Sequence, residues 1–167
     1  KPTHLSLQPQ NGFLFLLLCL IALQIIPPFI NPSERSILLG VLVGLVLLFA
    51  LYLVAYNRKE LIIGALLCAP AIATDWTDTS SDNALFVYLH YFFAIAFLGY
   101  TCLHILRYLF ETEDISADML YAAVCLYLVV GLIWGMIYVL IEMYQPGSFE
   151  LDADLNNTRQ VFSELNY

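Results

Sequence analysis

Long apolar runs restrict this chain to a small set of folds. They cover residues 12–30, 32–56, 61–76, 84–106 and 119–143. A helix needs about 20 predominantly apolar residues to cross the hydrocarbon core of a bilayer. Hydrophobic residues make up 61% of the chain and charged residues 12%, whereas a soluble domain is about half apolar and a quarter charged. The sequence therefore predicts an all-α, multi-pass membrane helical bundle with about five transmembrane helices.

Capping residues and a proline set the limits of these predicted helices. Asn31 is suited to cap the second helix, with Pro32 at its first position and Glu34 completing a capping box. Ser116 takes the corresponding place before the fifth helix. The third run is the shortest and contains Pro70, which should kink it. The third helix is therefore the least secure of the five membrane crossings.

The distribution of basic residues predicts the orientation. Five spans place the two termini on opposite sides of the membrane, and Lys and Arg favour the cytoplasmic side. With the N-terminus inside, the basic residues of the inner segments are Lys1, Arg58, Lys59 and Arg107, against Arg35 and Arg159 outside. We therefore expect a cell-membrane protein with a cytoplasmic N-terminus and an extracytoplasmic C-terminal tail.

Residues that support catalysis or cofactor binding are scarce. His90 and His104 lie 14 residues apart on the fourth run, a spacing that suits two stacked haems. The remaining histidine, His4, precedes the first run, so no second helix supplies further axial ligands. Polar packing or placement at the membrane interface is the favoured role for both. The acidic stretch over residues 75–82 is interpreted as a solvated loop. We therefore expect this chain to have no cofactor and no metal site and not to be an enzyme. The sequence also has no basic patch of the kind that binds nucleic acid, so we expect no nucleic-acid partner.

The fourth run lacks the arginine ladder of a voltage sensor. No Lys or Arg occurs from Leu61 to Leu106. A voltage sensor responds because charged side chains move across the membrane field. If the first four runs form a four-helix sensor-like module, we therefore expect it to move no gating charge.

Two pairs of glycines are spaced four residues apart. Gly40 and Gly44 lie in the second run, and Gly131 and Gly135 lie in the fifth. Glycines at this spacing share one helix face and let another backbone approach closely. Packing within the bundle is the favoured role, and association between subunits is the alternative.

The chain ends in a segment with the pattern of an amphipathic helix. Asn157 and Thr158 can cap this helix, and Val161, Phe162 and Leu165 then fall on one face. A helix that starts beyond a span and turns back toward the membrane is typical of a re-entrant pore helix. We therefore expect residues 157–167 to begin such a helix.

Residues 126–167, LYLVVGLIWGMIYVLIEMYQPGSFELDADLNNTRQVFSELNY, resemble part of the bacterial six-span potassium channels of the ion-channel superfamily. The similar region is the outer helix, the turret and the pore helix. The resemblance implies a sensor-like module over residues 1–110, and an outer pore helix, turret and partial pore helix over residues 111–167. It also implies a homo-tetramer around one axis. The pore-helix residues that it implies are Phe162, Ser163, Leu165 and Tyr167.

In that family a Thr-rich run, a Gly-Tyr-Gly filter and an inner helix follow the pore helix. The sequence stops at Tyr167, before any of these, and we expect it to be truncated within the pore helix. The filter binds K⁺ through backbone carbonyls, so K⁺ is a partner only when such a continuation completes the channel. The lipid bilayer is the other expected partner. The alternative is a small multi-pass membrane protein that serves as a binding or accessory subunit of a larger membrane complex.

Topology reporters test the five-span prediction. A reporter fused after Lys59 should lie in the cytoplasm and one fused after Asp154 should lie outside, because an odd number of spans separates the two positions. Alkaline phosphatase and green fluorescent protein activities distinguish the two sides. Both reporters on one side of the membrane would contradict the prediction. That result would mean that the third run does not cross the membrane.

Overall fold

The computed structural model describes residues 12–55, 58–77, 84–112, 116–145 and 148, without the side chains of 32–36, 74–77 and 84. The helices found in these residues are α1 (Gly12–Ile25), the 3-10 helix η1 (Pro27–Phe29), α2 (Pro32–Val54), α3 (Arg58–Thr77), α4 (Ala84–Glu111) and α5 (Ala117–Tyr144). The predicted all-α bundle is confirmed in this part of the chain.

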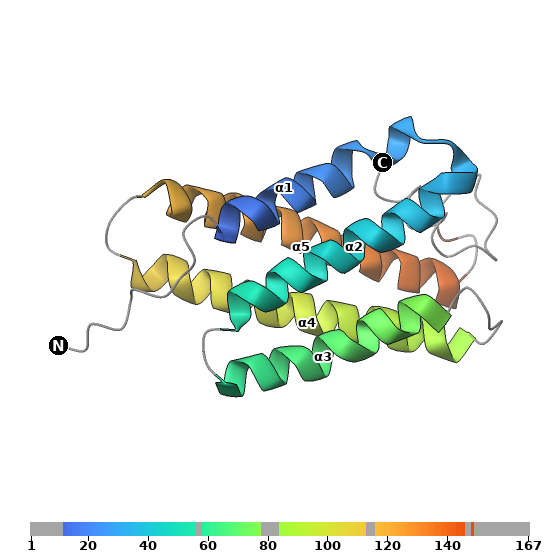
Figure 1. Cartoon of the computed structure of the whole chain (residues 1–167). Helices are drawn as coiled ribbons and strands as arrows, with labels where there is room; N and C mark the ends of the chain where they lie inside the picture. The colour runs from blue at the N-terminus through green and yellow to red at the C-terminus, as the bar shows by residue number, and fades with distance from the viewer. Residues whose placement is uncertain (1–11, 56–57, 78–83, 113–115, 146–147, 149–167) are drawn as a thin grey trace.

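Successive helices run antiparallel and form a ring (Figure 1). α1 packs on α2 and α5, α4 packs on α3 and α5, and α2 lies against α3. We call the end with the start of α1 proximal and the opposite end, where α1, α3 and α5 finish, distal. α5 lies between α1 and α4 in the same bundle. The predicted boundary at residue 110, between the sensor-like module and the pore region, stays a prediction.

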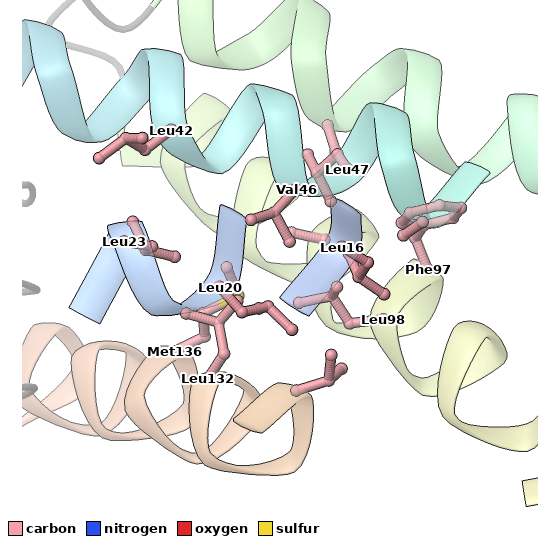
Figure 2. Close-up of a cluster of buried hydrophobic side chains, with 14 of the residues drawn as sticks. Leu16, Leu20, Leu23, Leu42, Val46, Leu47, Phe97, Leu98, Leu132 and Met136 are labelled. Carbon is pink, nitrogen blue, oxygen red and sulfur yellow. The ribbon is translucent and has the colours of Figure 1, made fainter. Parts of the chain in front are cut away.

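Apolar faces of all five α-helices meet in the core, and Figure 2 shows the part of it around α1. The buried side chains around α1 include Leu16, Leu20, Leu23, Val46, Leu47, Phe97, Leu98, Leu132 and Met136. Lipid tails are as apolar as leucine, so the hydrophobic effect does not drive helices together inside a bilayer. Close van der Waals packing of these side chains therefore holds the ring together.

α5 shows why this bundle belongs in a membrane. Its buried apolar residues recur every three or four positions and so share one face: Ala122, Cys125, Val129, Leu132, Met136 and Val139. The opposite face is also apolar, with Tyr127, Val130 and Trp134 exposed. A helix that is apolar on all sides is surrounded by other helices or by lipid.

Four segments are long and apolar enough to cross a bilayer: Gly12–Phe29, Ile37–Val54, Leu85–Glu111 and Ala117–Tyr144. α3 is not among these segments over the residues that the structure describes. Four of the five helices predicted to cross the membrane are therefore long and apolar enough to do so, and the crossing by α3 stays a prediction. α3 continues as one helix through Pro70. Its 20 residues give it a length of about 30 Å, and it runs beside α4 (Figure 1).

The predicted helix starts agree with the structure. Asn31 immediately precedes α2 and Pro32 opens it, although no side-chain hydrogen bond from Asn31 caps the helix. Ser116 caps α5, because its Oγ accepts a hydrogen bond from the backbone N–H of Met119 at 3.3 Å. The side chain of Glu34, predicted to complete the first cap, lies outside the described residues.

Gly64 of α3, which belongs to neither predicted pair, sits in a close contact between helices. A Cβ added to Gly64 would lie 2.9 Å from Cδ1 of Leu51 in α2 and 3.8 Å from Cε2 of Phe97 in α4. The missing side chain therefore lets α3 pack on two neighbours at once.

The four predicted packing glycines differ in their surroundings. Gly135 is buried in the α5 interface, and Gly40 is half-buried. A Cβ on Gly44 or on Gly131 would have no heavy atom within 4 Å. Among the residues that the structure describes, these two glycines therefore make no close approach to another helix, and their role between subunits stays a prediction.

Replacing Gly64 should weaken the bundle. Gly64→Leu should lower the free energy of unfolding by about 1–3 kcal/mol, because the added side chain overpacks a filled interface. Gly44→Leu puts the same side chain into open space and should not lower it by more than about 0.5 kcal/mol. Titration of the folded protein with a denaturing detergent measures both values. Equal losses in the two variants would contradict the assignment of Gly64.

Candidate functional site

The four predicted pore-helix residues, Phe162, Ser163, Leu165 and Tyr167, lie outside the described residues. The polar groups that the structure describes inside the bundle come mainly from α4 and α5. They are His90, Thr101 and His104 of α4 and Glu142 of α5.

His90 joins α4 to α3 in the distal half of the bundle. Its Nδ1 lies 2.8 Å from the carbonyl oxygen of Ala71. Because a carbonyl oxygen only accepts, Nδ1 carries the proton and donates it. The ring also packs edge-on against Tyr91, with 5.2 Å between ring centroids. In lipid no water competes for such a bond, so His90 fastens α3 to α4.

His104 lies in the proximal half of α4 and contacts an aromatic ring. The centroids of the His104 and Tyr100 rings are 4.7 Å apart, and the ring planes meet at 73°. Nearly four helical turns, about 21 Å, separate His104 from His90. Each histidine thus contacts groups of this bundle in the way expected for polar packing.

Two buried thiols also contact neighbouring helices. Sγ of Cys125 in α5 lies 3.4 Å from the carbonyl oxygen of Phe13 in α1. Sγ of Cys68 in α3 lies 4.0 Å from the carbonyl oxygen of Leu47 in α2. The described residues contain no group of three or more His, Cys, Asp or Glu side chains that could hold a metal ion. Their burial and their contacts with backbone carbonyls are those of small, weakly polar packing groups.

Glu142 is a buried charged residue that the apolar pattern of the fifth run conceals. It lies near the distal end of α5 and is only 1% exposed. Burying a carboxyl group away from water is costly unless other polar groups contact it, and such residues within membrane helices mark functional positions. Its sequence signal is a single acid between Ile141 and Met143.

The chemistry that these groups supply is helix positioning. His90, Cys68 and Cys125 each contact a backbone carbonyl of a neighbouring helix. Thr101, which is fully buried, donates to the carbonyl oxygen of Phe97 in its own helix at 3.0 Å. All four contacts satisfy polar side chains without water, and the three between helices also fix the helices relative to one another.

Comparison of the sequence with protein-family models and with curated proteins, and of the fold with solved structures, gave no match. Function is therefore inferred from the order, charge and burial of the helices.

Removing the His90 contact should loosen α3. His90→Phe keeps an aromatic ring but has no donor for Ala71, and should lower the free energy of unfolding by about 1 kcal/mol. His104→Phe retains a ring beside Tyr100 and should have the smaller effect. Detergent titration compares the two variants. A loss that is as large for His104→Phe as for His90→Phe would contradict the role assigned to His90.

Proposed function

We propose that this chain is the membrane-embedded portion of a potassium-channel-like protein that does not sense voltage. Residues 1–110 are its four-helix sensor-like module. Residues 111–167 are the outer pore helix, the turret and the first part of the pore helix. The chain lies in the cell membrane with its N-terminus in the cytoplasm. The observation that carries the proposal is the surface of α5.

α5 has the properties of a helix that supports further structure on its outer side. Its 28 residues give a length of about 42 Å, more than a crossing requires. One face packs on α1 and α4, while the other leaves Trp134 53% exposed. Trp134 and Tyr138 pair on this face, with ring centroids 6.0 Å apart. In the proposed channel the pore helix packs against this aromatic face.

The distribution of charge supports a channel without a voltage sensor. Arg107 is the basic residue of α4, and it lies in the last turns of the helix. Its Nε donates to Oε1 of Glu111 at 2.9 Å, and both side chains are mostly exposed. Moving one elementary charge across the membrane is worth about 2.3 kcal/mol per 100 mV. A pair of opposite charges at one end of α4 carries no net charge across the membrane, so it contributes no voltage-dependent free energy of this kind.

Potassium selectivity needs parts that follow the pore helix in this kind of channel. Rings of backbone carbonyls replace the hydration shell of the ion. Four copies of the chain around one axis provide four such loops. Residues 1–167 therefore conduct passively only when a filter and an inner helix complete them.

A chimera tests the proposal. Residues 1–167 are joined to the filter and inner helix of a complete potassium channel and reconstituted in a planar bilayer. The chimera should carry a K⁺-selective current whose conductance hardly changes with voltage, because α4 moves no charge across the field. The same filter and inner helix without residues 1–167 should carry none.

Two outcomes would overturn the proposal. One is a chimera that inserts and folds but does not conduct. The other is a selective K⁺ current from residues 1–167 alone, because the pore would then be built from residues that pack the bundle. A steep conductance–voltage relation in the chimera would overturn the absence of voltage sensing.

A second function, as an accessory subunit of a larger membrane complex, is supported by the surroundings of two glycines. Gly44 and Gly131 have open space around them on the surface of the bundle, where small residues let a helix of another protein approach. Co-purification of a membrane protein that is lost in Gly131→Ile, together with a chimera that does not conduct, would favour this function.

A further inference from the structure

We propose that the connection between α1 and α2, residues 26–30, lies among the acyl chains of the bilayer and binds lipid through Phe29. We call these residues the α1–α2 connector. This inference concerns the distal surface of the bundle and does not depend on the proposed channel function.

The length of α1 favours a place for the connector in the hydrocarbon. α1 has 14 residues and is about 21 Å long, whereas the hydrocarbon core is about 30 Å thick. The difference corresponds to about six helical residues. α1 is therefore too short to cross by itself. The apolar segment long enough to do so, Gly12–Phe29, includes most of the connector.

The backbone of the connector is suited to a place without water. Irregular backbone is excluded from lipid because unpaired N–H and C=O groups are costly there, and the donors of the connector are all accounted for. Pro27 and Pro28 have no N–H group. The three N–H groups that remain donate within the chain: Ile26 to Ala22 O at 3.0 Å, Phe29 to Ile26 O at 3.1 Å and Ile30 to Pro27 O at 3.3 Å. The connector therefore has no backbone donor that needs water.

The side chains of the connector match lipid as a partner. Phe29 is 85% exposed, and Ile25 and Ile26 beside it are exposed as well. The sequence from Gly12 to Pro32 contains no charged residue. The exposed surface continues along α1 through Leu18 and Ile21. A protein partner would usually meet some polar groups at the rim of such a surface, whereas acyl chains require none.

Fluorescence quenching tests the position of Phe29. Phe29→Trp is made in a background with Trp76→Phe and Trp134→Phe, and Gln145→Trp in the same background is the control. Gln145 is exposed at the same distal end, just beyond the 28 residues of α5. Both proteins are reconstituted in phosphatidylcholine vesicles, and circular dichroism confirms that they fold.

The two tryptophans should respond oppositely. Lipids brominated in their acyl chains should quench the tryptophan of Phe29→Trp strongly, and aqueous iodide should quench it little. Iodide should quench that of Gln145→Trp at least about threefold more, since residues beyond a long helix reach the headgroup region. Equal quenching of the two tryptophans by iodide, or no quenching of the first by brominated lipid, would overturn the proposal.

A charge placed at the connector gives an independent measurement. Phe29→Asp should lower the folding equilibrium constant in bicelles by about tenfold or more, because a carboxylate is costly among acyl chains. Tyr144→Asp is the matched control, because Tyr144 is 81% exposed and lies at the distal end of the longer α5. It should change the constant by less than about threefold. Equal changes in the two variants would contradict a connector buried in lipid.

Discussion

The fold depends first on pairing every backbone polar group without water. Inside a bilayer this condition leaves helices as the usual solution, and the described residues of this chain adopt little else. The connector between α1 and α2 meets this condition for its donors, because its two prolines have no N–H group and its other three amides bond locally. Hydrogen bonds within a helix, prolines without an N–H group and the local bonds of a 3-10 turn thus each avoid an unpaired backbone donor in the membrane.

Packing then decides how the helices meet. Since the hydrophobic effect gives no preference between lipid and another helix, shape and a few polar contacts supply the specificity. Gly64 opens room for Leu51 and Phe97, and His90 donates to a carbonyl on the same helix, α3. α3 is the helix for which composition gives the weakest signal of a crossing. The Gly64 contact and the His90 hydrogen bond both hold this helix against its neighbours.

The sequence allowed the helices and several of their limits to be predicted, because these are local properties. Apolar length marks a span wherever it occurs, and the Ser116 cap needs only residues a few positions away. Which face of a helix meets a neighbour is not local. The spacing of Gly40 and Gly44 predicted close packing, yet the space next to Gly44 is open. Gly64 has no glycine four residues away, yet it fits between two neighbouring helices. Glu142 was concealed for the same reason, since burial depends on α5 lying between α1 and α4.

The place of α5 in the ring bears on how a channel built from this chain would be controlled. α5 is not a separate arm, because its face with Leu132 and Met136 packs into the core together with Leu16 and Leu20 of α1. A well-packed interior transmits displacement and does not absorb it. A pore helix resting on α5 would therefore follow movements of the whole bundle. In the proposed channel, α4 would add little voltage-dependent force to such a movement, because Arg107 and Glu111 are paired at its proximal end. Any displacement of the neighbouring helices would therefore reach α5, and a pore helix resting on it, through the contacts of α5 with α1 and α4.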